Sequence, residues 1–265
     1  MRDPNGRNAD KAHSLLQQAK GLRGEVRIID LDVLSEPSAD KAVRSIEATD
    51  GRLDVVVHNA AHLFFGVTEA FSPEALMEAF DVNCVGAHRV NRAALPGMRE
   101  RGKGLLLWIG SGTTRAIPPF LGPYTTAKAA FDALCEATAW DIAIYGVETT
   151  MLMPGVFTEG TAHFAKAVSP KDAERVNAYS KVQPFLDSNL EDTKRMFPTG
   201  VSADPQIVAD EIVRIVNLPV GQRPRRAIAD GSDYGAEIVN GAAEQLRLRL
   251  AKRMHVTGLL AGNDR

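Results

Sequence analysis

Short apolar runs alternate along this chain with longer segments in which apolar residues recur at helical spacing. The runs at residues 53–57, 105–109 and 147–153 predict strands, because a strand covered on both faces of a sheet is continuously apolar. The intervening segments predict helices, one of which begins with Ser72 as its N-cap and Pro73 in its first turn. This alternation predicts an α/β fold built on a parallel sheet.

Further elements are predicted on both sides of this central part. In chain order they are a helix at residues 8–19, a strand at 25–31, helices at 37–49 and 204–217, a strand at 225–229 and a charged helix at 233–253. Residues 159–200 are less patterned, and a segment of that length is often functional. We expect one domain over residues 1–265, with a C-terminal helix and tail at 233–265.

The composition is that of an ordinary globular protein, with 45% hydrophobic and 24% charged residues. A net charge of −2 argues against nucleic acid or an anionic membrane as the main partner. No apolar run approaches the roughly 20 residues of a membrane span, and residues 1–6 lack the apolar core of a signal peptide. Cys84 and Cys135 are too few for a disulfide framework, so we expect reduced thiols and a cytoplasmic protein.

Three polar residues follow the 105–109 strand at a spacing that suits catalysis. Tyr124 and Lys128 are four apart, so they share one face of the predicted helix. A free tyrosine titrates near ~10, and a neighbouring ammonium lowers that pKa towards the working range of an acid or base. Ser111, at the end of the strand, can offer a hydroxyl to the same ligand atom. The alternative is a solvated helix face with a half-buried tyrosine.

Other polar side chains admit both a structural and a functional interpretation. Asp32 follows the 25–31 strand, where α/β sheets bind ligands, but it would also suit the cap of the next helix. Asn83 lies among apolar neighbours in a helix, so its amide needs a partner there. His58 and His62 have no cysteine or acidic companions, and we predict no metal site.

Together these segments resemble the classical short-chain dehydrogenase/reductase family. The matching pieces, in the family's order, are Asp32-Val33, His58-Asn59-Ala60-Ala61, Asn83, Ser111, Tyr124 with Lys128, and Pro154-Gly155 with Thr158. His58 and Ala61 depart from the family, which usually has Asn and Gly there. The resemblance, over residues 1–230, implies a Rossmann-like, doubly wound parallel sheet and an NAD(P)-dependent oxidoreductase.

The resemblance also implies roles for these residues. Tyr124 would exchange a proton with the substrate oxygen, Ser111 would orient that oxygen, and Asn83 would support the proton relay. Lys128 would lower the pKa of Tyr124 and bind the nicotinamide ribose. Residues 159–200 would cover the substrate. Cofactor contacts are implied for Arg2, Asp32, Val33, Asn59, Ala60, Ala61, Tyr124, Lys128, Pro154, Gly155, Val156 and Thr158.

No glycine-rich turn precedes the first predicted strand. The helix at 8–19 and the strand at 25–31 match the family's third helix–strand pair, so the first two strands and the first helix, on the order of 35–40 residues, are expected to be absent. Either Met1 is an internal methionine of a longer protein, which we favour, or the chain is a degraded relative. Arg2 could pair with a 2′-phosphate, which slightly favours NADP over NAD.

We expect an oxidoreductase that transfers a hydride between NAD(P) and a fairly apolar alcohol or carbonyl compound. The alternative is a truncated relative without catalytic activity that acts through subunit contacts. A family member that epimerises or dehydrates its substrate is a third possibility. The expected partners are a small-molecule substrate and further copies of the chain, in a homodimer or homotetramer.

Overall fold

A parallel sheet of four strands forms the centre of the described part of the chain. The computed structural model describes residues 14–201 and 203–260. Its strands are β1 (Val55–His58), β2 (Gly104–Ile109), β3 (Val147–Pro154) and β4 (Arg226–Ala229), in the order β1-β2-β3-β4. Because all neighbours are parallel, the strands end at one edge. The predicted Rossmann-like α/β fold is confirmed.

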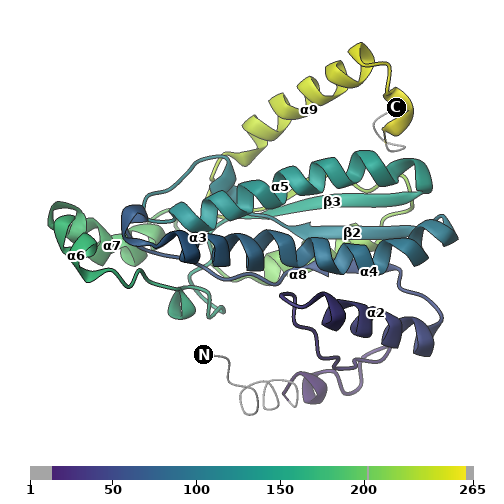
Figure 1. Ribbon diagram of the computed structural model, residues 1–265, viewed down its shortest axis with the longest axis horizontal. Helices are drawn as coiled ribbons and strands as arrows, with labels where there is room; N and C mark the ends of the chain where they lie inside the picture. The colour runs from purple at the N-terminus through teal and green to yellow at the C-terminus, as the bar shows by residue number, and fades with distance from the viewer. Residues whose placement is uncertain (1–13, 202, 261–265) are drawn as a thin grey trace.

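Helices cover both faces of this sheet. The α-helices are α2 (Glu36–Asp50), α3 (Pro73–Phe80), α4 (Gly86–Arg101), α5 (Gly122–Ile142), α6 (Ala173–Ala178), α7 (Gln183–Lys194), α8 (Gln206–Asn217) and α9 (Ala236–Arg253). Figure 1 shows α3, α4 and α5 on the near side of the strands, and a π-helical turn (Asp81–Val85) joins α3 to α4. None of the described helices combines the length and apolar content that a membrane crossing requires.

The helix boundaries follow from local chemistry. Ser72 caps α3 by accepting a hydrogen bond from the backbone N–H of Ala75, as the Ser-Pro sequence predicts. Gly102 ends α4 with a φ of 64°, and Gly146 ends the 3₁₀ turn that follows α5 with a φ of 73°. Both conformations lie in the left-handed region that favours glycine.

The core has two layers, one on each face of the sheet. On one face, Trp108 and Met151 pack with Met98 of α4 and Phe131 of α5. On the other, side chains of β2, β3 and β4 pack against α8, where Ile215 is fully buried. Burial on both faces explains why β2 is apolar at every position after Gly104.

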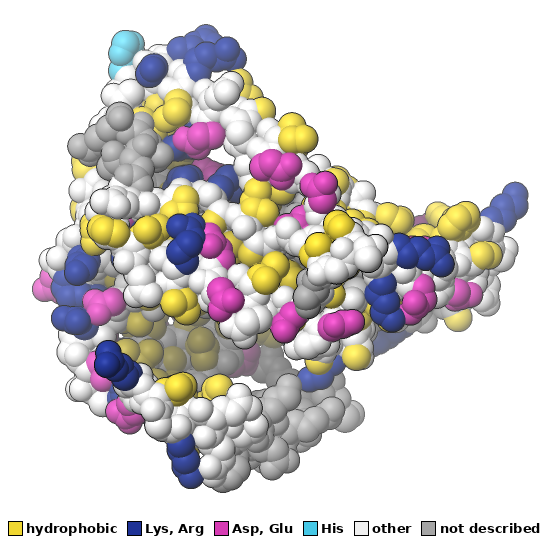
Figure 2. All heavy atoms as spheres, turned by 180° about the vertical axis from the view of Figure 1, so that it is seen from behind, with side chains coloured by type: hydrophobic (Ala, Val, Ile, Leu, Met, Phe, Trp, Pro, Cys, Tyr) yellow, Lys and Arg dark blue, Asp and Glu magenta, His cyan; other side chains and the backbone are white. Residues whose placement is uncertain are grey.

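The predicted strand at residues 25–31 is wrong: these residues have no strand structure and are exposed. Among the described strands β1 pairs with β2 alone, so residues 25–31 have no strand beside them. A strand without a hydrogen-bonded neighbour is unstable in water, which explains the difference. Val26, Ile28 and Val57 are 40%, 48% and 41% exposed. From behind, hydrophobic side chains are visible inside a hollow (Figure 2).

A buried histidine stands at the carboxyl end of β1. The Nε2–H of His58 donates to Asn91 Oδ1 at 2.7 Å, and its ring lies 4.6 Å from that of Trp108. Burial lowers the pKa of His58 from its ordinary value of 6.5 to about 4, although the bond to Asn91 opposes the shift. His58 is therefore neutral at neutral pH.

This neutral histidine predicts a loss of stability in mild acid. As the pH falls below 6.5, His58 becomes protonated in the unfolded chain, whereas in the folded chain it is protonated only near pH 4. Between those values the wild type should lose about 3 kcal/mol more of its free energy of unfolding than His58→Asn does. Urea unfolding at a series of pH values checks this. His255→Asn, at an exposed position, should keep the wild-type pH dependence; parallel curves for wild type and His58→Asn would contradict the prediction.

Candidate active site

Ser111, Tyr124 and Lys128 come together at the carboxyl end of β2. Ser111 follows the strand in extended conformation, and Tyr124 lies in the first turn of α5. Lys128, one turn later, donates from Nζ to the carbonyl oxygen of Ile109 at 2.8 Å, and its Nζ lies 6.0 Å from the centre of the Tyr124 ring. The three side chains are buried, with exposed fractions of 7%, 7% and 3%.

Burial decides the protonation of this group. Burial raises the pKa of Tyr124 to about 12, while hydrogen bonding with the Ser111 side chain opposes the rise. Burial also lowers the pKa of Lys128 to about 8. The expected lowering of the Tyr124 pKa by Lys128 is not seen: desolvation raises that pKa, and the hydrogen bond with Ser111 is the interaction that opposes the rise.

Asn83 holds the segment that follows β1. In the π-helical turn it accepts a hydrogen bond from the backbone N–H of His62 at 2.8 Å and donates to the carbonyl oxygen of the same residue at 3.0 Å. Both ends of the buried amide are thus satisfied by backbone. The segment from Asn59 to Ala61 lies just before this anchor, and its Asn59 and Ala60 are exposed.

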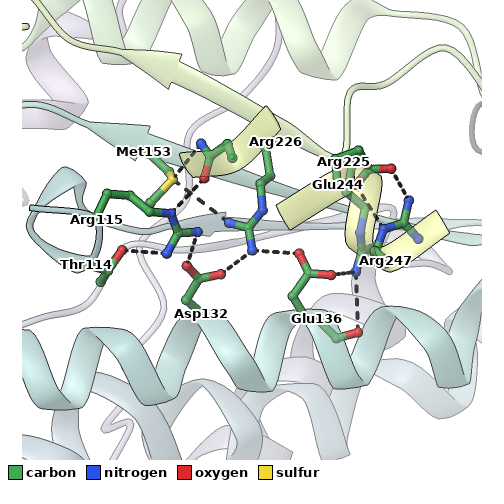
Figure 3. Close-up of polar contacts among 10 residues, drawn as sticks. Thr114, Arg115, Asp132, Glu136, Met153, Arg225, Arg226, Glu244 and Arg247 are labelled. Carbon is green, nitrogen blue, oxygen red and sulfur yellow. Dashed lines mark hydrogen bonds and ion pairs between the residues drawn. The ribbon is translucent and has the colours of Figure 1, made fainter. Parts of the chain in front are cut away.

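An ion-pair network fixes the turn after Ser111. Arg115 contacts Asp132 of α5 at 2.5 Å and donates to Asn240 of α9 at 2.8 Å. Arg226 of β4 donates to the other oxygen of Asp132 at 2.6 Å (Figure 3). Figure 3 also shows the contacts continuing from Arg226 to Glu136 and from Glu136 to Arg225, with a separate pair formed by Glu244 and Arg247. Since the charges are mutually paired where water is largely excluded, the turn is anchored to α5, β4 and α9.

The segment after β3 packs closely against the turn after β4. Asp230 accepts hydrogen bonds from the backbone N–H groups of Ser232 and Tyr234, at 2.7 and 2.8 Å. A Cβ added at Gly155 would lie 1.7 Å from an oxygen of Asp230. The hydroxyl of Thr158 is buried, and no described atom is its hydrogen-bond partner. Pro154 and Val156 flank Gly155 in the same half-buried segment.

Asp32 and Val33 precede α2. Asp32 Oδ1 accepts a hydrogen bond from the backbone N–H of Leu34 at 3.0 Å, whereas Ser35 is the N-cap of the helix. Val33 packs against Gly86 at the start of α4. Arg2 lies outside the described residues.

Two aromatic residues at the site were not predicted from the sequence. His163 contacts Tyr124 with ring centres 5.6 Å apart. Tyr234 packs against Gly112, next to Ser111: a Cβ added at Gly112 would lie 3.2 Å from the Cβ and Cγ of Tyr234. Neither residue has a spacing motif, because each reaches the site from a separate loop. Their one local signal is their position shortly after a predicted strand.

Comparison with known proteins identifies the class to which this fold and site belong. A sequence profile of the short chain dehydrogenase family matches residues 5–171. Human 17-beta-hydroxysteroid dehydrogenase type 1 is 35% identical over 200 residues, which are 74% of this chain and 58% of that protein. The uncharacterized oxidoreductase YusZ of Bacillus subtilis is 26% identical over 216 residues, 79% of this chain and 73% of its own length.

Solved structures agree in fold. A short-chain dehydrogenase from Streptomyces avermitilis matches with a TM-score of 0.65 and 24% identity, covering 92% of this chain and 85% of its own. An alcohol dehydrogenase from Thermococcus sibiricus, complexed with 5-hydroxy-NADP, matches with a TM-score of 0.64 and 22% identity, covering 84% and 82%. The chain belongs to the short-chain dehydrogenase family and is an NAD(P)-dependent oxidoreductase.

Close packing at Gly155 predicts a position-specific cost for a single methyl group. Gly155→Ala should destabilise the protein by about 1–3 kcal/mol, because the new Cβ overlaps Asp230. The matched control, Gly241→Ala in α9, meets nothing within 4 Å and should stabilise by about 0.5–1 kcal/mol through helix propensity. Urea unfolding measures both. Equal stability of Gly155→Ala and the wild type would refute the packing argument.

Proposed function

We propose that this chain interconverts an alcohol and a carbonyl compound, with Tyr124 as the group that exchanges the proton with the substrate oxygen. The observation that carries the proposal is the buried cluster of Ser111, Tyr124 and Lys128 at the carboxyl end of β2. A bound nicotinamide supplies or accepts the hydride.

The proposed roles follow from the protonation of the site. With a pKa raised to about 12, Tyr124 keeps its proton at neutral pH and can donate it to a carbonyl oxygen that gains negative charge. Ser111, whose hydroxyl lies 2.8 Å from that of Thr113, orients the same oxygen. The ammonium of Lys128 stabilises the phenolate that remains. Asn83, through the backbone of His62, supports the relay that returns a proton.

Features of the chain's own residues support a dinucleotide beside this cluster. The buried Thr158 hydroxyl lacks a partner among the described atoms, and an amide ligand would satisfy it. The remaining contacts are proposed from the family resemblance. Asp32 and Val33 would contact the adenine, and the small residues from Asn59 to Ala61 would let the backbone come close to the dinucleotide. Pro154 to Val156 would contact the nicotinamide, and Tyr124 with Lys128 would contact the ribose. The slight preference for NADP rests on Arg2.

We also propose that the substrate is fairly apolar. Tyr124 belongs to a cluster with Leu63, Phe64 and Phe71, against which Leu121 and Phe164 are packed. The human relative is named for a hydroxysteroid, which is a mostly apolar alcohol. A homodimer or homotetramer in the cytoplasm completes the proposal; the exposed Ile238 and Leu246 of α9 suit a subunit contact.

Removing the phenol hydroxyl tests the proton exchange. Tyr124→Phe should lower kcat at least ~100-fold and leave the thermal unfolding temperature close to that of the wild type, since only a proton donor is lost. Tyr145→Phe is the matched control, because Tyr145 is half exposed beyond the end of α5. Reduction of a panel of apolar ketones, followed by nicotinamide absorbance, gives the rates. Full activity in Tyr124→Phe would exclude this role.

Thr158→Val tests the cofactor contact without using turnover. NADP(H) or NAD(H) should raise the unfolding temperature of the wild type, as any ligand of the folded state does. The variant should bind the dinucleotide about tenfold more weakly, while its own stability is unchanged or higher, because it loses a buried hydroxyl without a described partner. Thr49→Val, on the exposed side of α2, is the control. Undiminished dinucleotide affinity in Thr158→Val would rule out the contact.

A further inference from the structure

His163 is placed against the Tyr124 ring by the segment between β3 and α6. The two rings meet edge to face, with centres 5.6 Å apart and planes at 68°. The next residue, Phe164, packs against the apolar cluster that contains Tyr124. Neighbouring side chains of one short turn therefore cover the phenol.

The backbone holds this turn in place. Val168 donates to the carbonyl oxygen of Leu63 at 2.8 Å and accepts a hydrogen bond from the N–H of Phe65 at 2.9 Å, forming a parallel bridge beside Phe64. At the other end, the N–H of Gly155 donates to Ala229 of β4 at 3.0 Å. The segment that carries His163 is thus held at both ends.

The imidazole of His163 has unused hydrogen-bonding capacity. No atom in the described part of the chain forms a hydrogen bond with its ring nitrogens; only its backbone N–H is bonded, to Thr161 Oγ1 at 3.2 Å. Burial, together with the positive charges of Lys128 and His62, lowers the pKa of His163 to about 4. At neutral pH the ring is neutral and offers one donor and one acceptor.

We propose that His163 binds a second oxygen of the substrate, a hydroxyl on the carbon next to the reacting carbon. This inference rests on the proposed function of Tyr124. The ring contact sets the imidazole beside the phenol, and we infer that it faces the substituents next to a ligand oxygen bound at the Tyr124 hydroxyl. A hydroxyl both donates and accepts, so it can satisfy either nitrogen. The favoured substrates are then vicinal diols and α-hydroxy ketones with an apolar remainder.

The alternative is that His163 only packs its ring on Tyr124 and forms no hydrogen bond with the substrate. Two substitutions separate these roles: His163→Phe keeps a ring and removes the nitrogens, whereas His163→Gln keeps a donor and an acceptor. His255→Phe, at an exposed position beyond α9, is the control.

Binding of trans-cyclohexane-1,2-diol and cyclohexanol is measured by ligand-observed NMR with Tyr124 intact, without dinucleotide and with NADPH, since neither condition allows an alcohol to be oxidised. The chain should bind the diol about tenfold or more tightly than the mono-alcohol, since a site built for a hydroxyl rejects an analogue that lacks it. His163→Phe should abolish this preference, His163→Gln should keep part of it, and His255→Phe should keep it fully.

Failure to bind the diol, absence of a preference, or a preference that survives His163→Phe would overturn the inference. In parallel, kcat/KM for 2-hydroxycyclohexanone and cyclohexanone is measured with Tyr124 intact. Equal kcat/KM values for the two ketones would contradict the inference about His163 and would agree with the proposed function. A diol preference without any hydride transfer to either ketone would contradict the proposed function and, with it, the inference that the bound diol is a substrate.

Discussion

The ammonium of Lys128 lies where water does not reach, and it donates to the carbonyl oxygen of Ile109. A buried charge needs such a hydrogen-bond partner, because a buried charge without a partner strongly destabilises the folded state. Ile109 is the last residue of β2, so this bond fixes the first turns of α5 against the carboxyl end of the strand. The place of Tyr124, one helical turn earlier, depends on it.

The same burial governs the chemistry of the pair. Desolvation favours the uncharged form of each group, so the pKa of Tyr124 rises and that of Lys128 falls. A phenolate in this place would be costly alone and would gain from the ammonium beside it. Tyr124 therefore keeps its proton at neutral pH, which suits the role of proton donor that we propose for it.

Two kinds of attachment hold the segments at the carboxyl edge of the sheet. The turn after β2 is held by Arg115 and Asp132, and the turn after β4 by Asp230. The segment that carries His163 is attached through backbone bonds and through the apolar side chains of Phe164, Ala167 and Val168. A loop on a rigid scaffold can change its side chains without disturbing the groups that the scaffold holds, which is why we propose that this loop selects the substrate.

The sequence by itself determined the features that depend on neighbouring residues. The cap at Ser72, the glycine ends at Gly102 and Gly146, and the four-residue spacing of Tyr124 and Lys128 are local. Apolar runs predicted β1, β2 and β3, because burial on both faces of a sheet leaves that pattern. Only the tertiary structure decided what depends on distant partners. Residues 25–31 are apolar enough for a strand, but no described strand lies beside them to pair with. The pKa of Tyr124 is raised because the fold excludes water, and His163 reaches the phenol from a separate loop.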